Sequence, residues 1–129
     1  MLVVALAAQD VEGRLLMQQR PAGKHHAGLW EFPGGKVETY EIPREALARE
    51  IREELAITLE PGNLEPAGFA EGVASDGQTP IVLLLYKSTR FDGDIAAQEC
   101  QAWGWFARGE AARLPLAPMD AQLLAGLSG

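Results

Sequence analysis

The sequence predicts an α/β fold, in which strands and helices are interspersed along a single domain comprising residues 1–129. Two kinds of segment predict it. Apolar runs of strand length, bounded by turn residues, fall at about residues 2–9, 14–19, 30–33, 64–74, 80–89 and 102–106. Helical patterns occupy about residues 43–55 and 118–127. With 129 residues, 47% of them hydrophobic, and no linker-like tract, the chain can bury one sizeable core.

The first strand is expected at the apolar residues 2–8. This segment lacks a basic stretch before it and is far too short to span a bilayer, so we interpret it as a buried strand and not as a signal peptide or membrane span. Residues 10–13 and 75–78 carry the Asp and Gly that are typical of hairpin connections.

Each predicted helix has an apolar side that can cover a sheet. On the first helix this stripe consists of Leu47, Ala48, Ile51 and Leu55. On the second it consists of Leu123, Leu124 and Leu127. We expect the second helix to cover the face of the sheet opposite to the first.

Three glutamates, Glu50, Glu53 and Glu54, lie within five residues of the first helix, on neighbouring positions of one face. Like charges at this spacing destabilise a helix by about 0.2 to 0.5 kcal/mol per pair. The cluster is therefore either a solvated face, with Arg49 and Arg52 as surface partners, or a site for a hard cation.

The segment before this helix favours the cation site. Residues 29–38 form an aromatic and apolar run that contains Gly34 and Gly35, where the backbone can approach a ligand closely. Gly35 is followed after five residues by Glu41 and after seven more by residues 49–57. This pattern resembles the Nudix box, a loop-helix-loop motif that binds divalent metal and a diphosphate. The resemblance implies an α/β/α sandwich around a central mixed β-sheet.

Three positions depart from the family pattern. Ala56 stands where the family has a glycine, so the helix is expected to end without the usual left-handed glycine cap. Tyr40 and Ile42 stand where a glycine and a capping Thr or Ser are common, which leaves Ile42 as a poor N-cap before Pro43.

The resemblance assigns the metal to the box. It implies Mg²⁺, for which Mn²⁺ can substitute, bound by Glu50 and Glu54, with Glu53 and the carbonyl of Gly35 completing the site directly or through water. Arg49 is expected to orient a box carboxylate such as Glu41. The implied reaction is hydrolysis of a nucleoside diphosphate linkage, in which the metal neutralises charge on the phosphoryl oxygens and activates water.

The base that activates the water has rival candidates. Within the box, the residues expected to be catalytic are Arg49, Glu50 and Glu53. Some relatives also use a carboxylate outside the box. Glu99 lies six residues before Trp105, at the corresponding spacing in MutT-like members, although it could also be an exposed loop acid. Glu50 and Glu99 are therefore both kept as candidates.

The resemblance extends to MutT-like nucleoside triphosphate pyrophosphohydrolases, including the CTP pyrophosphohydrolase branch. It rests on residues 19–21, His25, 29–35 and 114–120. By position, Arg20 and His25 match phosphate-contacting residues, although Arg20 alone would more often form a surface ion pair. The residues expected to line the nucleoside pocket are Glu31, Phe32, Pro33 and Gly34.

Asp120 is expected to determine specificity. It stands where MutT has an asparagine that reads the base, and an ionised carboxylate only accepts hydrogen bonds. It should favour a base edge that offers donors, such as the amino group of cytosine or the N1–H and N2–H₂ of guanine. The alternative is that Asp120 is only a favourable charge at the start of the last helix.

Charge and cysteine content limit the partners. The net charge of −7 argues against binding to a nucleic-acid polymer or a membrane, which depends on clustered basic residues, but not against a nucleotide bridged by Mg²⁺. The single cysteine, Cys100, excludes an internal disulfide and suits the cytoplasm. A monomer or a homodimer is expected.

The leading hypothesis is therefore a Mg²⁺-dependent enzyme that converts nucleoside triphosphates, preferably oxidised ones such as 8-oxo-dGTP, to the monophosphate and pyrophosphate. CTP, dCTP or a modified cytosine nucleotide is the nearest alternative substrate. A noncatalytic, nucleotide-sensing domain is the alternative from another class.

Overall fold

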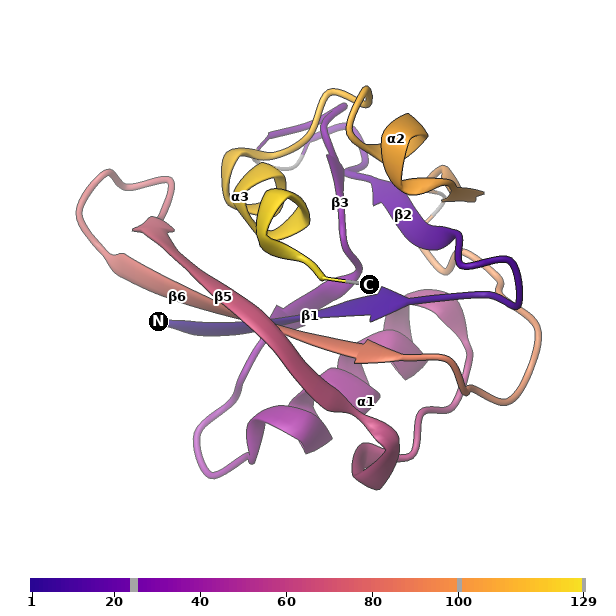
Figure 1. The fold of residues 1–129 in the computed structure, drawn as a ribbon. Helices are drawn as coiled ribbons and strands as arrows, with labels where there is room; N and C mark the ends of the chain where they lie inside the picture. The colour runs from indigo at the N-terminus through magenta and orange to yellow at the C-terminus, as the bar shows by residue number, and fades with distance from the viewer. Residues whose placement is uncertain (24–25, 100, 129) are drawn as a thin grey trace.

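The computed structural model describes residues 1–23, 26–99 and 101–128, so His25 and Cys100 lie outside the described residues. Its strands are β1 (Leu2–Ala8), β2 (Leu15–Gln19), β3 (Trp30–Glu31), β4 (Gly34–Lys36), β5 (Glu65–Val73), β6 (Pro80–Ser88) and β7 (Trp103–Phe106). Its helices are α1 (Pro43–Leu55), the 3₁₀ turn η1 (Pro61–Asn63), α2 (Arg108–Ala111) and α3 (Pro118–Gly126). Figure 1 shows α1 and α3 on opposite sides of β1 and its neighbouring strands.

The strands form two sheets. The larger has the order β4-β1-β6-β5, and it is mixed, because β1 runs parallel to β6 while the other pairs are antiparallel. The smaller is antiparallel, with the order β3-β2-β7. The expected α/β architecture with a mixed sheet is confirmed, and the smaller sheet adds a second layer of strands beside it.

Alternation along β1 separates two cores. Val4 and Leu6 are fully buried on the side of α1, together with Leu47, Ile51 and Leu55. Ala5 and Ala7 point the other way and pack with the leucines of α3. The second helix therefore covers the opposite face of the sheet, as its apolar pattern predicted.

Strand β4 was not predicted, because two of its three residues are glycines, which have low strand propensity. It pairs with β1, with Gly35 opposite Val4. A Cβ atom on Gly34 would collide with the carbonyl oxygen of Val4. The glycine pair is thus needed for packing against β1 as well as for the site. The short helices η1 and α2 were also not predicted.

The two ends of α1 differ in how they are capped. Ile42 at the N-cap makes no side-chain capping bond, as expected. At the other end, the expectation that the left-handed cap is lost is wrong: Ala56 itself adopts φ 61° and ψ 22°, and its N–H donates to the carbonyl of Arg52. Tyr40 also has a positive φ of 72°. Two positions that favour glycine are therefore occupied by residues with side chains.

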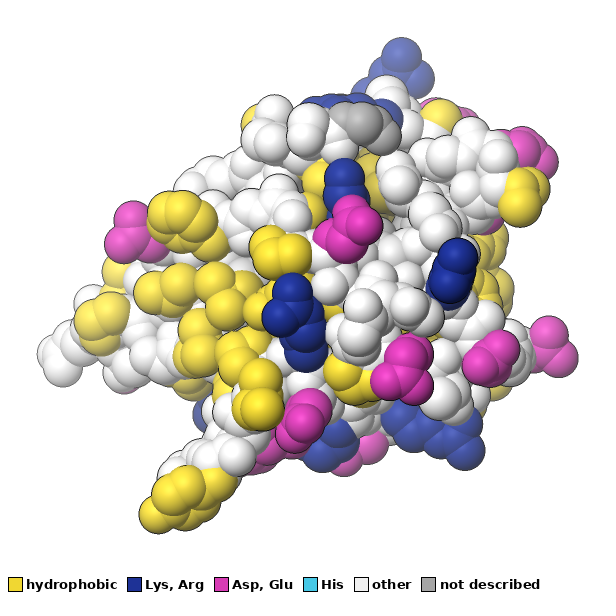
Figure 2. Space-filling model, turned by 60° about the horizontal axis from the view of Figure 1, so that its bottom comes forward, with side chains coloured by type: hydrophobic (Ala, Val, Ile, Leu, Met, Phe, Trp, Pro, Cys, Tyr) yellow, Lys and Arg dark blue, Asp and Glu magenta, His cyan; other side chains and the backbone are white. Residues whose placement is uncertain are grey.

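The face that carries α1 is unevenly covered. Figure 2 shows hydrophobic side chains gathered on the side of the β5–β6 hairpin. Phe69, Val73 and Val82 are exposed there, and β5 is an edge strand of the larger sheet. None of the helices in the described ranges is long and apolar enough to cross a membrane.

Candidate functional site

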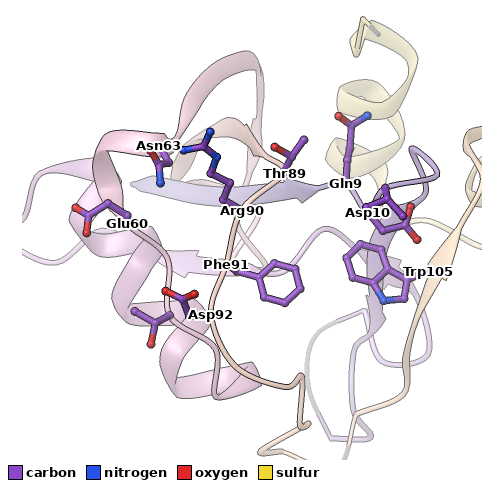
Figure 3. Close-up of a pocket in the computed structure, with 11 residues that line it drawn as sticks. Gln9, Asp10, Glu60, Asn63, Thr89, Arg90, Phe91, Asp92 and Trp105 are labelled. Carbon is purple, nitrogen blue, oxygen red and sulfur yellow. The ribbon is translucent and has the colours of Figure 1, made fainter.

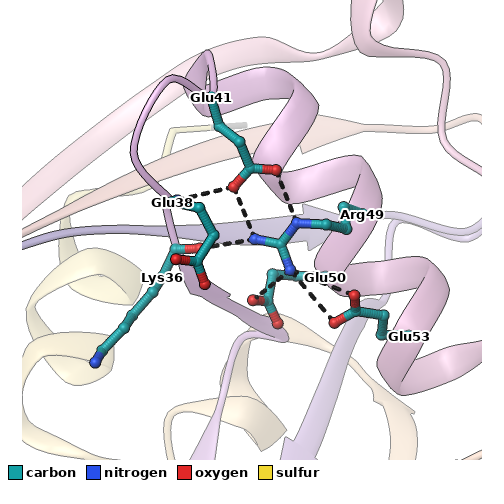
Figure 4. A network of polar contacts seen from close by, with 6 residues as sticks. All are labelled: Lys36, Glu38, Glu41, Arg49, Glu50 and Glu53. Atoms are coloured by element: carbon teal, nitrogen blue, oxygen red, sulfur yellow. Dashed lines mark hydrogen bonds and ion pairs between the residues drawn. The ribbon is translucent and has the colours of Figure 1, made fainter.

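Arg49 ties the loop before α1 to the glutamates of the helix (Figure 4). Its Nε and Nη2 donate to the two carboxylate oxygens of Glu41 at 2.7 and 2.8 Å. Nη1 donates to Glu50 at 3.0 Å and to Glu53 at 3.3 Å, and Nη2 also reaches the carbonyl of Lys36 at 3.1 Å. The expected contact between Arg49 and Glu41 is present as a two-point pair, which a lysine could not make.

This pairing sets the charge state of the loop. The Arg49 side chain is the main cause that lowers the pKa of Glu41 to about 2, with a further contribution from the Glu38 N–H, which donates to Glu41 at 2.8 Å. The Glu41 bond also raises the pKa of Arg49. Both groups stay ionised throughout the physiological pH range.

Glu50 packs against the glycine pair. A Cβ atom on Gly35 would collide with the Glu50 carboxyl group, so a larger residue there would displace this carboxylate. Burial is the main cause that raises the pKa of Glu50, and Arg49 opposes it. The side chain of Glu53 is 59% exposed and points to Arg49. Both carboxylates are therefore held by the same guanidinium group.

Glu54 has a different environment from its two neighbours. Burial, followed by the charges of Glu31 and Glu50, raises its pKa to about 8. The side-chain amide of Gln18 donates to Glu54 Oε2 at 3.4 Å. A carboxyl group that resists ionisation in this way is one whose charge a bound cation would stabilise.

A cleft of about 800 Å³ is lined by Gly35, Glu54, Glu99, Phe32 and Asp120. Of the three box glutamates, only Glu54 lines it, whereas Glu50 and Glu53 do not. Expected site residues from distant parts of the sequence thus share one cavity, whose size suits a nucleotide.

Arg20 and Glu31 form an ion pair in the same cleft, with Nη1 2.7 Å from Oε1. Gly34 lines the cleft, as expected for the pocket segment. Pro33 is a correction: it is fully buried and lies behind the wall, where its carbonyl accepts a bond from Leu6 N–H at 2.8 Å. His25, the other expected phosphate contact, lies outside the described residues.

Asp120 is buried, with 6% of its surface exposed, and lies in the first turn of α3. Its Oδ1 accepts a hydrogen bond from the Phe32 N–H at 3.0 Å. Burial is the main cause that raises its pKa to about 7, and the Phe32 bond opposes this. Burial thus makes the charged form of Asp120, which the sequence-based interpretation assumed, more costly than in water.

Two cleft residues were not predicted, Gln18 and Gln101. They are 4% and 6% exposed, and they join Glu54, Glu31 and the backbone of Glu99 in one hydrogen-bonded network. Gln18 follows three apolar residues in β2. A polar residue within a buried strand is the sequence feature that could have identified it as part of the site.

The carboxylates do not form a ready-made metal cage. Among the residues that the structure describes, no three His, Cys, Asp or Glu side chains converge closely enough to hold a metal ion as they stand. Arg49 pairs with Glu50 and Glu53 at 3.0 and 3.3 Å. By donor chemistry, these carboxylates, Glu54 and the Gly35 carbonyl fit a hard divalent ion, because all are oxygen ligands.

A second cavity of about 600 Å³ lies at the ends of β1 and β6. Phe91 and Trp105 stack there with their ring centroids 6.2 Å apart, and polar side chains including Asp10, Arg90 and Asp92 surround them (Figure 3). None of the glutamates of α1 lines this cavity. The expected site therefore belongs to the larger cleft.

Comparison with known proteins agrees with this geometry. The family model described as the NUDIX domain matches residues 1–127. The CTP pyrophosphohydrolase of Escherichia coli K12 is 42% identical over 128 residues, covering 96% of this chain and 89% of that protein. The putative 8-oxo-dGTP diphosphatase 2 of Mycobacterium tuberculosis H37Rv is 33% identical over 132 residues, covering 97% and 87%.

A solved structure shares the whole fold. The crystal structure of a MutT NUDIX hydrolase from Burkholderia pseudomallei superposes with a TM-score of 0.86 at 28% identity, covering 98% of this chain and 97% of that one. The resemblance inferred from the box is confirmed over nearly the full length. The chain therefore belongs to the Nudix family and is a Nudix pyrophosphohydrolase.

Proposed function

We propose that the protein hydrolyses nucleoside triphosphates to the monophosphate and pyrophosphate, with Mg²⁺ as the metal and oxidised nucleotides such as 8-oxo-dGTP as preferred substrates. It would remove them from the cytoplasmic nucleotide pool. The observation that carries the proposal is that Glu54 and Glu99 line the same cleft as the buried Asp120 and Phe32. This arrangement suits a ligand with phosphates at one end and a base at the other.

The proposed roles follow this polarity. Mg²⁺, held by Glu50, Glu53, Glu54 and the Gly35 carbonyl, would neutralise charge on the phosphoryl oxygens and activate the attacking water. Arg20 would exchange its bond to Glu31 for a substrate phosphate. Asp120 would bind the donor edge of the base through the oxygen that Phe32 does not occupy.

The general base is proposed to be Glu99, with Glu50 as the rival. Glu99 lines the cleft, whereas Glu50 accepts a bond from Arg49 at 3.0 Å and packs against Gly35. Glu99 therefore faces the space that a substrate would occupy, whereas Glu50 does not line the cleft. Under this assignment, Glu99→Gln lowers kcat and leaves metal binding unchanged, whereas Glu50→Gln weakens metal binding.

Cytosine nucleotides are the second candidate substrates, because Asp120 suits the cytosine amino group as well as the guanine edge. The similarity to a protein named CTP pyrophosphohydrolase favours them further. Both substrates use the same reaction at the same site.

A substrate panel tests the proposal. Pyrophosphate release is measured with Mg²⁺ at low micromolar 8-oxo-dGTP, dGTP, CTP, dCTP and 5-methyl-dCTP, with Glu54→Gln as the inactive control. A kcat/KM highest for 8-oxo-dGTP supports removal of oxidised nucleotides, and one highest for the cytosine nucleotides replaces it with the second candidate. No release from any of the five refutes the proposal.

A further inference from the structure

Two buried glutamines line the cleft beside Glu54. Only four polar side chains in the described ranges are buried, and three of them, Gln18, Gln101 and Asp120, line this cleft. Gln18 belongs to β2, and Gln101 directly precedes the segment that leads to β7. Burying a carboxamide is costly unless its donors and acceptor are bonded, so these two side chains are expected to have defined partners.

Every hydrogen-bonding group of the two amides has such a partner. Gln18 Nε2 donates to Glu31 Oε2 at 3.1 Å and to Glu54 Oε2 at 3.4 Å. Gln18 Oε1 accepts from Gln101 Nε2 at 3.3 Å. Gln101 Nε2 also donates to the carbonyl of Glu54 at 3.2 Å, and Gln101 Oε1 accepts from the Glu99 N–H at 2.9 Å. Turning either amide over would place oxygen against acceptors, so each orientation is fixed.

These amide side chains carry no net charge, which suits a position beside a metal site. Glu31 and Glu54 both accept hydrogen bonds from Gln18 Nε2, so two carboxylates of like charge lie close together here. An arginine or lysine between them would relieve the repulsion but would also cancel the negative charge that attracts a divalent ion. An amide with two N–H groups holds both carboxylates and leaves their charge available.

We propose that Gln18 and Gln101 are positioning residues that set the Glu54 carboxylate and the Glu99 segment in place for metal binding and turnover. The two glutamines act through Glu54, Glu31 and the backbone of Glu99. The inferred effect on catalysis rests on the proposed function. Its effect on metal binding is independent of which nucleotide is the substrate.

Gln18→Met and Gln101→Met test this inference, because methionine has a similar length and shape but cannot form these bonds. Gln98→Met is the matched control, since Gln98 is exposed in the same loop and its side chain donates to the carbonyl of Ala96. Mn²⁺ binding is measured by electron paramagnetic resonance without nucleotide, and kcat and KM are measured with Mg²⁺. Thermal unfolding establishes that each variant is folded.

Both test variants are expected to weaken Mn²⁺ binding and lower kcat by about 10-fold to 100-fold, the range seen when groups that orient metal ligands are removed. The KM for nucleotide should change by less than about 3-fold, and the double variant should lose less than the product of the two single losses. Gln98→Met should match the wild type.

Folded Gln18→Met and Gln101→Met proteins that bind Mn²⁺ as tightly as the wild type overturn the inference. If one variant does not fold, the other decides, since each removes the bond between the two amides. If the wild type hydrolyses no nucleoside triphosphate, the proposed function fails, while the Mn²⁺ titrations still decide whether the glutamines position Glu54.

Discussion

Asp120 combines two properties that matter for base recognition. Its Oδ1 is already occupied by the Phe32 N–H at 3.0 Å, so one oxygen remains to meet a base. Burial raises its pKa to about 7, so the acceptor-only form becomes dominant as the pH rises above neutrality. Recognition of a donor-rich base edge should therefore strengthen with pH in this range.

The Asp120→Asn substitution tests this role. The introduced amide can keep the Phe32 bond through its oxygen, which leaves an N–H₂ group facing the base. Loss of a hydrogen bond to a charged group is worth about 1.5 to 3 kcal/mol, so kcat/KM for the best substrate should fall about 10-fold to 150-fold, mostly through KM. Steady-state kinetics from pH 6 to 8.5 should show a rise through pH 7 in the wild type only. Unchanged selectivity in Asp120→Asn would mean that the residue only stabilises α3.

Helix α1 serves as the platform of the site, and Arg49 fixes its position relative to the preceding loop. Arg49→Lys keeps the charge but loses the two-point pair with Glu41 and the reach to Glu50 and Glu53. The free energy of unfolding should fall by about 1 to 2 kcal/mol. We also expect kcat to fall at least about tenfold, because the box carboxylates lose their support.

The matched control is Arg52→Lys on the same helix. Arg52 is exposed, and its Nη1 reaches the carbonyl of Ala56 and the Thr58 hydroxyl at 3.4 and 3.3 Å. Urea unfolding and kcat should be close to wild type. Equal losses in the Arg49 and Arg52 variants would argue against a specific clamp.

The C-terminal end of α1 carries avoidable strain. Ala56 adopts φ 61°, where a Cβ atom is unfavourable, so Ala56→Gly should stabilise the protein by about 1 kcal/mol. Ala48→Gly in the middle of the helix should instead destabilise it by at least about 1 kcal/mol. Urea unfolding measures both. A loss of stability in Ala56→Gly would show that the alanine side chain contributes more through packing than its conformation costs.

The pH dependence of stability belongs to the whole molecule. Glu54 and Asp120 have pKa values near 8 and 7, above those of an unfolded chain, so the folded state holds more protons than the unfolded state between about pH 5 and 8. The free energy of unfolding without metal should therefore fall as the pH rises through this window, by about 1 to 3 kcal/mol. Glu41 and Asp76 have lowered pKa values of about 2 and are ionised throughout, so they do not change this slope.

Urea unfolding in EDTA at pH 5.5 and 8.5 checks this expectation. Glu54→Gln should reduce the fall, because it removes a buried charge. Excess Mg²⁺ should stabilise the wild type more at pH 8.5 than at pH 5.5, since protons and metal compete for the same carboxylates. Stability that rises with pH in EDTA would contradict the burial of these groups.

Sequence patterns predicted the two longer helices, α1 and α3, and most strands, because periodicity is a local property. The spacing of glycines and glutamates identified the family, and the metal-binding role of these residues stays a prediction. The features that escaped prediction are tertiary. Strand β4 forms from glycines only because β1 lies beside it, and the raised pKa of Asp120 comes from the packing of α3. Gln18 and Gln101 lie 83 positions apart, so their bond has no local signature.

Identification of the reaction products tests the central claim most directly. The purified protein is incubated with 8-oxo-dGTP and Mg²⁺, and the products are resolved by ³¹P NMR beside the Glu54→Gln variant and an EDTA control. The account predicts equal amounts of nucleoside monophosphate and pyrophosphate from the wild type, and loss of most turnover in the variant and in EDTA. Release of orthophosphate with a nucleoside diphosphate, or equal turnover by Glu54→Gln, would contradict it.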